Sequence, residues 1–223
     1  MLRQAQHDKQ KNKHLKTNAS LKPSLPGRVW EGRLLIMKTL TQSIRLTLVL
    51  LVLLCVIYPV LISFAGKLSK GQGDGEKVTL NGKTVGYALL GQKFDKPQYF
   101  WSRPSAVGYN AAGSAGSNKG PSNPDYLKDV QSRIDTLLKY NPGIKKSDIP
   151  ADMVTASGSG LDPAISPQGA AIQIKRIATI RKIDEKEVAD LVAANTQKPL
   201  LGLFGPSTVN VLELNIALDK FKK

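Results

Sequence analysis

The stretch from Leu46 to Ala65 limits what this chain can fold into more than any other. No charged residue lies between Arg45 and Lys67, and leucine, valine and isoleucine dominate the run. About 20 apolar residues at a rise of ~1.5 Å each span the ~30 Å hydrocarbon core of a bilayer. Pro59 lies inside the run, but a kinked membrane helix can satisfy a freed carbonyl group through its neighbours. The run therefore predicts one transmembrane helix over 46–65.

The charges around this run predict its orientation. Ten basic and two acidic residues occur up to Arg45, so this part carries +8 of the chain's net charge of +15. Segments rich in lysine and arginine stay in the cytoplasm and attract anionic lipid. We expect a basic cytoplasmic tail over 1–45, a linker over 66–76 and one soluble domain over 77–223 outside the cytoplasm. The tail contains no nucleic-acid-binding motif, so membrane lipid and not nucleic acid is its expected partner.

A cleaved signal peptide is the alternative interpretation of the apolar run. Ser63, Phe64 and Ala65 follow the small-x-small pattern of a cleavage site. Against this alternative, the run exceeds the usual ~7–15 apolar residues, and a charged lead of 45 residues is long for a signal peptide. We therefore favour a retained, single-pass anchor in the plasma (inner) membrane.

Cysteine and histidine usage restricts the chemistry of the domain. Cys55 is the only cysteine and lies in the apolar run, while His7 and His14 are the only histidines and precede it. The domain after the anchor can therefore hold no disulfide, thiolate metal site, histidine zinc site or Ser–His triad. We expect the chain to bind no metal and no cofactor of its own.

Local patterns predict an α+β domain. Asn81-Gly82 between two alternating runs predicts a β-hairpin, and residues 91–124 are expected to be irregular, with Phe100 and its aromatic neighbours anchoring them in the core. Ile149 to Thr155 is expected to be extended. Helices are predicted to begin at Asn123-Pro124, Ser166-Pro167 and Asp184, the last with a capping box completed by Glu187, and an amphipathic helix closes the chain. In the second of these helices, one face is expected to be apolar and the other polar. The apolar face comprises Ala171, Ile174, Ile177 and Ile180, and the polar face comprises Lys175, Arg176 and Arg181.

Two enzymatic alternatives need no histidine. Asp152 and Asp162 are a carboxylate pair of the kind used in glycoside hydrolysis, although carboxylates beside helix starts more often cap amide groups. Ser157 or Ser159 with Lys175 would form the Ser–Lys pair of a membrane-anchored hydrolase with an external active site. ATP hydrolysis by this chain alone is not expected, because a Walker A loop would need glycine at Lys77.

Several segments, in order, resemble the C-subunit family of the Kdp potassium-transporting P-type ATPases. The most specific is Thr-Ala-Ser-Gly-Ser-Gly-Leu-Asp-Pro at 155–163, and others are Arg103-Pro104-Ser105 and the run Val209 to Asn215. The resemblance covers about Leu46 to Leu218. It implies a non-catalytic subunit of an ATP-driven K⁺ import complex, with ATP and K⁺ bound by the complex.

The resemblance also implies the partners and the role. The partners would be a KdpA-like channel subunit, a KdpB-like P-type ATPase subunit and a small KdpF-like subunit. The chain would be needed for assembly and would act as a catalytic chaperone that supports ATP binding by the ATPase subunit. On the residues themselves, we expect partner contact or loop architecture, and no catalysis, from a set that comprises Arg103, Ser105, Asn118, Asn123, Ser157, Ser159 and Asp162.

Overall fold

The computed structural model describes residues 25–221 of the chain. The chain divides into two compact units, Met1–Gly66 and Lys67–Lys223. The first 24 residues of the expected basic tail lie outside the described residues.

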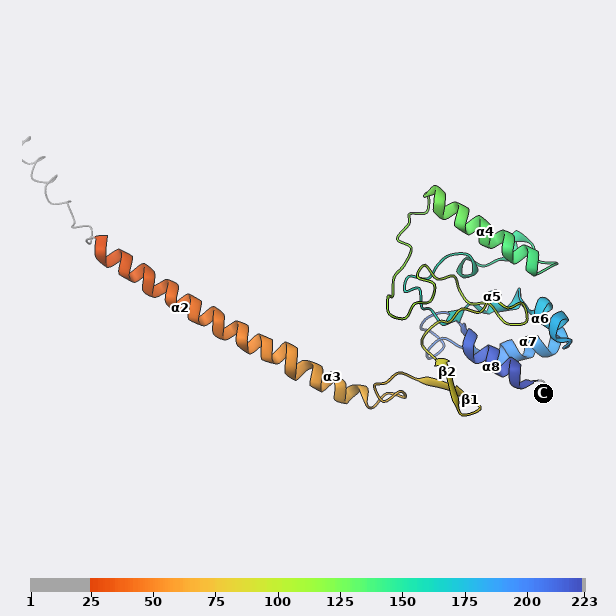
Figure 1. The fold of residues 1–223 in the computed structure, drawn as a ribbon, viewed down its shortest axis with the longest axis horizontal. Coiled ribbons are helices and arrows are strands. Elements are labelled where there is room, and N and C mark those ends of the chain that lie inside the picture. Colours follow the sequence, from red (N-terminus) through yellow and green to blue (C-terminus); the bar gives the residue numbers. More distant parts are fainter. Residues whose placement is uncertain (1–24, 222–223) are drawn as a thin grey trace, which may run out of the picture. The chain divides into compact units, whose positions relative to one another are not determined.

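The described part of the first unit, residues 25–66, is one continuous run of helix. Helix α2 (Leu25–Val52), a π-helical turn η1 (Leu53–Ile57) and helix α3 (Tyr58–Gly66) follow one another without a break, as Figure 1 shows. The widened turn directly precedes Pro59, which has no N–H to donate to the carbonyl group four residues earlier. The Tyr58 N–H instead donates to the Leu53 carbonyl, five residues back. The helix thus accommodates the proline without ending.

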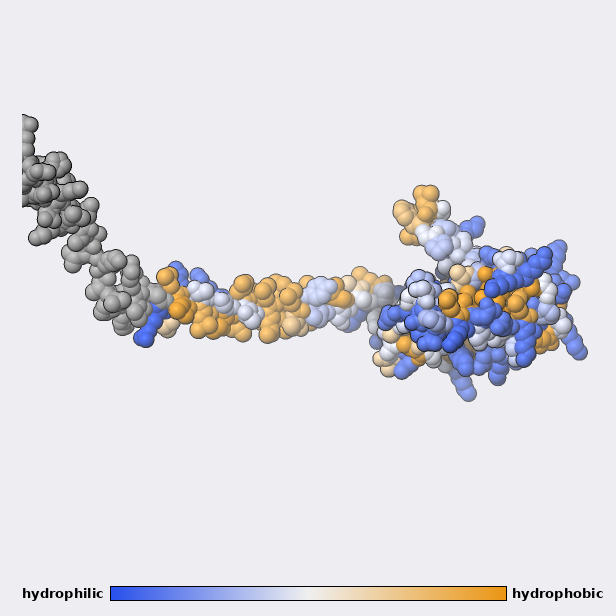
Figure 2. Space-filling model, turned by 90° about the horizontal axis from the view of Figure 1, so that it is seen from above, coloured by the Kyte–Doolittle hydropathy of each residue, from blue (hydrophilic) through white to orange (hydrophobic). Residues whose placement is uncertain are grey.

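Part of this run is able to cross a membrane. Residues Arg33–Gly66 are long and apolar enough to span a bilayer, with a mean hydropathy of 2.9 over their most apolar 18-residue stretch, and no other helix among the described residues passes this test. Apolar residues cover the helix in Figure 2, and none of them is buried within the chain. The predicted fold class, an α+β domain preceded by an N-terminal helix able to span a membrane, is confirmed.

The second unit begins with the predicted hairpin. Strands β1 (Lys77–Leu80) and β2 (Lys83–Tyr87) pair antiparallel, and Leu80 lies opposite Lys83 across the turn. Asn81 and Gly82 have φ angles of 52° and 75°. A two-residue turn of this kind needs left-handed backbone at both positions, which asparagine and glycine tolerate best.

A second, three-stranded antiparallel sheet and five helices complete the domain. The order of the strands is β3 (Ala164–Ile165), β5 (Thr208–Asn210) and β4 (Thr196–Gln197). The helices are α4 (Pro124–Tyr140), α5 (Pro167–Ala171), α6 (Ile174–Arg181), α7 (Glu185–Ala194) and α8 (Val211–Phe221). The three predicted helix starts are confirmed: Asn123 and Ser166 accept amide hydrogen bonds at their helix starts, and Asp184 forms its capping box with Glu187.

The core joins these helices to an irregular segment. Residues 91–124 contain no helix or strand up to the start of α4, as predicted. Phe100 from this segment is fully buried in one apolar cluster with residues of α4, α6, α7 and α8, including Leu137, Ile177, Val188 and Leu214. The prediction that aromatic residues anchor this segment in the core is confirmed at Phe100.

Two local predictions are wrong. Ile149 to Thr155 is not extended. The short helical turn η2 (Lys146–Asp148) directly precedes this segment, and a second turn, η3 (Ala151–Met153), lies within it, because the Val154 and Thr155 amides both donate back to the Ala151 carbonyl. The helix that begins at Pro167 is interrupted after Ala171.

The faces of its second half, α6, also differ from the prediction. Arg176 is buried and 4% exposed, whereas Ile180 is 46% exposed. The physical reason is that Arg176 bonds to backbone groups of the irregular segment, which is described below.

Candidate functional site

An ion pair joins the two glycine-rich loops that the sequence singles out. The first loop is 103–124 and the second is 155–163. Arg103 Nη1 donates to Asp162 Oδ2 at 3.0 Å, and Arg103 Nε donates to the Thr155 carbonyl at 3.4 Å. Both charged side chains are about one-third exposed, at 27% and 31%. The pair is partly shielded from water, so it holds the loops more firmly than a fully exposed pair would.

Ser105 is a second link between the loops. Its hydroxyl donates to the Gly160 carbonyl at 2.6 Å and accepts from the Tyr109 amide at 2.9 Å. Gly160 has a φ of 69°, and a Cβ atom there would lie 2.5 Å from Val107 Cγ2 and 2.8 Å from the Ala115 carbonyl oxygen. The loops therefore pack so closely at this point that only glycine fits.

Tyr109 and Ser114 extend the same contact. The Tyr109 hydroxyl donates to the Arg103 carbonyl at 2.5 Å, and burial raises the pKa of Tyr109 to about 12. The Ser114 hydroxyl donates to the Ser159 carbonyl at 3.0 Å. Because side-chain donors of the first loop bond backbone acceptors on both loops, each loop fixes the conformation of the other.

The remaining predicted residues of the second loop serve its own backbone. Asp162 Oδ1 accepts from the Ala164 amide at 3.0 Å, and the Ser159 hydroxyl accepts from the Leu161 amide at 3.1 Å. Ser157 is buried, and its amide donates to the Pro104 carbonyl at 3.1 Å. The structure thus brings together Arg103, Ser105, Ser157, Ser159 and Asp162.

Asn118 and Asn123 lie further along the first loop, and neither bonds to the second loop through a contact described above. Asn118 is exposed at a left-handed backbone position with a φ of 52°. Asn123 Oδ1 accepts from the Asp125 and Tyr126 amides at 3.0 and 3.1 Å, which caps α4.

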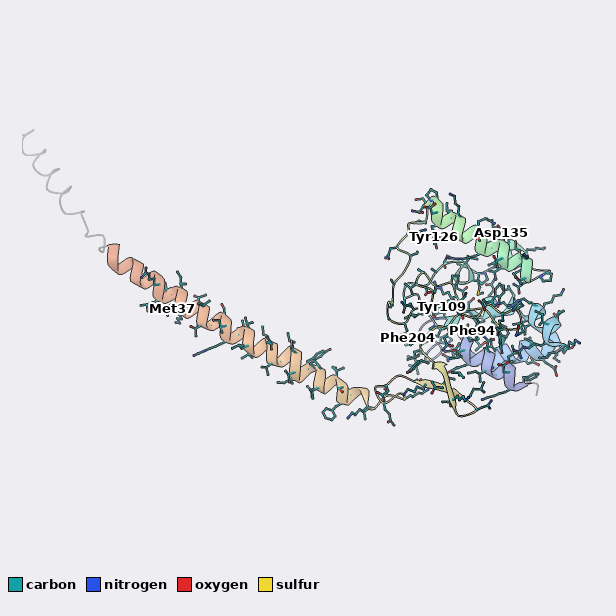
Figure 3. All side chains as sticks on the ribbon, in the orientation of Figure 1. Met37, Phe94, Tyr109, Tyr126, Asp135 and Phe204 are labelled. Carbon is teal, nitrogen blue, oxygen red and sulfur yellow. The ribbon has the colours of Figure 1, made fainter. Side chains whose placement is uncertain are left out.

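A cavity lies beside the first loop, against α4. Its volume is about 390 Å³, and its walls include four aromatic side chains, Phe94, Trp101, Tyr109 and Tyr140. Phe94 and Tyr109 are labelled in Figure 3. The Trp101 and Tyr140 rings meet edge to face at 5.2 Å. The cavity is thus mainly apolar, with Lys93 and Arg133 among its charged residues.

Two amide side chains that the sequence did not single out clamp the aromatic segment beside this cavity. Asn215 accepts from the Phe100 amide at 2.9 Å and donates to the Phe100 carbonyl at 3.0 Å. Gln173 accepts from the Trp101 amide at 2.7 Å and donates to the Gly169 carbonyl at 2.9 Å. Each amide replaces the partner that a neighbouring strand would give to an extended segment. One feature of the sequence could have indicated these two residues: each is a polar residue at a position where the helical pattern places an apolar one.

Arg176 completes this buried polar cluster. Its guanidinium donates to Asn141 Oδ1 at 2.9 Å, to Gln173 Oε1 at 2.7 Å and to the carbonyl of Tyr99 at 3.1 Å. It also lies 4.5 Å from the centre of the Trp101 ring. Burial lowers the pKa of Arg176 to about 10, so the group remains charged at neutral pH. Its neutral partners hold the irregular segment against α6.

No contact in the described residues supports either enzymatic alternative, the Asp152 and Asp162 carboxylate pair or the Ser–Lys pair. Asp152 accepts from the Ser166 amide at 2.7 Å and from its hydroxyl at 3.1 Å, which is a helix-start role. Asp162 is paired with Arg103. Lys175 is exposed, and its Nζ lies near Gly143 at the end of α4; no hydrogen bond joins it to Ser157 or Ser159 in the part of the chain that the structure describes.

Comparison with known proteins shows the family. The model of the KdpC family, described as "K+-transporting ATPase, c chain", matches residues 40–220. A potassium-transporting ATPase KdpC subunit of Flavobacterium johnsoniae is 62% identical over 186 residues, which cover 83% of this chain and all of the relative. The KdpC subunits of Bacteroides fragilis strain YCH46 and Caldanaerobacter subterraneus are 53% and 47% identical, over 83% and 82% of this chain and 99% and 95% of the relatives.

Fold and site together define a class of protein: an α+β domain attached to a helix that can span a membrane, with loops braced by their own polar side chains. Within that class, the chain belongs to the KdpC family of K⁺-transporting ATPase subunits. It is therefore an accessory subunit of a K⁺ transport complex.

Proposed function

We propose that the domain lies outside the cytoplasm, is needed for assembly of the complex, and acts as a catalytic chaperone by docking on the ion-conducting subunit. The observation that carries this proposal is the use of Arg103, Ser105 and Asp162 to brace the two loops. Side chains that are occupied in this way build a rigid surface, and a rigid surface loses little entropy when it binds a partner.

The partners follow from the proposed complex: a channel-like KdpA-type subunit, a P-type KdpB-type subunit and a small KdpF-type subunit. ATP and K⁺ would be bound by these subunits. Because ATP is cytoplasmic and the domain is placed outside, its support of ATP binding would be indirect, through the conformation of the ion-conducting subunit. The basic segment before the span is consistent with this orientation.

The test is isolation of the tagged full-length chain from its own membrane under K⁺ starvation, in mild detergent. We expect a channel-like subunit and a P-type ATPase in constant ratio, and a higher KM for ATP in a complex that lacks this chain. Recovery of the chain alone in several detergents would contradict the proposal and would return attention to the Ser–Lys alternative.

A matched pair of variants tests the loop surface. Arg103→Ala removes the ion pair to Asp162, whereas Lys93→Ala removes an exposed pair to Asp95. We expect the first variant to lower complex yield and K⁺ uptake severalfold and the second to leave both unchanged. Equal yield and uptake for both variants would mean that Arg103 serves only the fold of the domain.

A further inference from the structure

The aromatic cavity beside α4 has the layout of a small-molecule site. Leu137 and Met153 line it and are each only 3% exposed, so they form its floor, while the half-buried Trp101 and Tyr109 form its walls. Its volume of about 390 Å³ lies near the lower end of the range of ~300–1,000 Å³ in which proteins bind small molecules. A cavity of this size with flat aromatic walls suits a ligand of one or two rings.

Contacts within the domain hold these walls in place. The centre of the Trp101 ring lies 4.5 Å from the Arg176 guanidinium and 5.2 Å from the centre of the Tyr140 ring. The Trp101 Nε1 donates to the Lys96 carbonyl at 3.2 Å. The hydroxyl of Tyr109, which Figure 3 labels, is likewise bonded to a backbone carbonyl. Because these rings are fixed before a ligand arrives, little conformational entropy is lost on binding.

Arg133 indicates the charge of the ligand. Its side chain lines the cavity and is only partly exposed. The Nη1 group donates to the Val154 carbonyl at 2.8 Å, and Arg133 forms no ion pair within the part of the chain that the structure describes. A guanidinium carries five N–H donors, so most of them remain for a ligand. A partly shielded cation with donors to spare favours an anion, because charge-assisted hydrogen bonds are the strong ones.

The other charges of the cavity favour a ligand with a single negative charge. Lys93 and Asp95 line the cavity at its exposed rim and pair with each other at 3.2 Å, so together they add no net charge. A ligand with two or more negative charges, such as a phosphate monoester, would place a charge without a counter-charge in a mainly apolar cavity, which is costly. A planar carboxylate matches the fork of the Arg133 guanidinium in shape as well as in charge.

We propose that this cavity binds an aromatic monocarboxylate. Its rings lie against Trp101, Tyr109 and Tyr140, and its carboxylate accepts hydrogen bonds from Arg133. Ring contacts with fixed aromatic walls and one charge-assisted interaction supply the affinity. The site goes beyond the proposed function and does not depend on it, because every residue that forms the site belongs to the domain itself.

Quenching of Trp101 fluorescence by 1-naphthoate tests the site. The probe is titrated into the full-length Trp30→Phe chain in detergent, in which Trp101 is the only tryptophan. We expect saturable quenching. The neutral 1-naphthamide should bind at least about tenfold more weakly, because it has the rings without the charge, and decanoate should displace the probe at least about tenfold more weakly, because it has the charge without the rings. Absence of saturable quenching, or equal affinity for either analogue, would overturn the proposal.

Substitutions at Arg133 locate the carboxylate. In the Trp30→Phe chain, Arg133→Gln removes the charge and should raise the Kd for 1-naphthoate at least about tenfold, whereas Arg133→Lys retains the charge and should raise it less. Lys93→Ala, at the rim, should change the Kd less than about threefold, because Lys93 is already paired with Asp95. An unchanged Kd in Arg133→Gln would overturn the proposal.

A blocking substitution tests the cavity without changing any charge. Thr136 is an exposed lining residue on α4, and Thr136→Phe should occupy the mouth of the cavity and abolish saturable quenching. Ser132→Phe is the matched control, because Ser132 is exposed one turn earlier on α4 and does not line the cavity. Both positions are exposed, so thermal unfolding should stay the same in the two variants. Equal binding by the two variants would overturn the proposal.

Discussion

Asn215 illustrates, at the scale of single residues, how this domain holds an irregular segment in its core. The side chain is 2% exposed and satisfies both backbone groups of Phe100. Asn215→Leu keeps a similar volume but leaves a buried N–H and a buried carbonyl unpaired, which should cost about 2–4 kcal/mol. Thermal and urea unfolding of the full-length chain in detergent, followed by circular dichroism, measures the loss.

Gln131 provides the control for this prediction. It lies exposed on α4, where its side chain donates to Asp135 Oδ1 at 2.8 Å and accepts from Lys146 Nζ at 3.3 Å, both at the surface. Gln131→Leu should therefore change stability by less than about 0.5 kcal/mol. A similar loss for both variants would contradict the role of Asn215 as a clamp.

Tyr109 should make stability depend on pH in the alkaline range. The pKa of Tyr109 is raised from 10.0 to about 12 by burial, so the unfolded chain loses this proton at lower pH than the folded chain does. The group's contribution is present below pH 10 and is lost as pH rises from 10 to 12. Urea unfolding at several pH values should show that the advantage of the native chain over Tyr109→Phe shrinks across this interval. An advantage that stays constant would show that the hydroxyl does not titrate there.

The close approach of the two loops gives a prediction at the scale of elements. Gly160→Ala would place a Cβ atom 2.8 Å from a backbone oxygen at a left-handed φ of 69°. Neither loop can move away without breaking the hydrogen bond of Ser105 to Gly160. We therefore expect the free energy of unfolding to fall by about 2–4 kcal/mol. Faster proteolysis within 103–124 should accompany the fall in melting temperature.

Gly158 is the matched control, two residues away in the same loop. A Cβ atom there would meet nothing within 4 Å, and its φ is not left-handed. The free energy of unfolding of Gly158→Ala should therefore lie within about 1 kcal/mol of that of the native chain. If both variants unfold alike, steric crowding is not what requires glycine at 160.

Elements with local signals could be predicted from the sequence. Asn81-Gly82 specifies its own turn, and the caps at Asn123, Ser166 and Asp184 act on amides within three residues. Ala151–Met153 could not be predicted, because its apolar and β-branched surroundings suit a strand equally well. The short strands of the second sheet pair over long sequence separations and leave no local pattern.

Some residues of the candidate site could likewise be predicted from the sequence, and others could not. Arg103, Ser105 and Asp162 stood out through a specific motif and a family resemblance. Gln173, Arg176 and Asn215 did not, because their partners are backbone groups 72 to 115 residues away in an irregular segment. The helical pattern treats Arg176 as a solvent-facing residue, and only the tertiary position of Tyr99 and Pro97 makes its burial favourable.

At the scale of the whole molecule, orientation decides how the domain can act on an ATP-driven complex. The charge difference across the span predicts that residues before Arg33 face the cytoplasm and the two loops face outward. In a Cys55→Ala chain, Ser122→Cys lies on the exposed part of the first loop, and Ser20→Cys lies in the basic tail.

A membrane-impermeant maleimide should label Ser122→Cys in intact cells (or spheroplasts, where an outer membrane is present) and should label Ser20→Cys only after the membrane is opened. The Cys55→Ala chain itself should remain unlabelled, since it has no other cysteine. The reverse pattern would place the domain with ATP in the cytoplasm. Direct contact with the nucleotide-binding subunit would then replace docking on the ion-conducting one, because only a domain outside the cell must act on ATP binding through the membrane-embedded part.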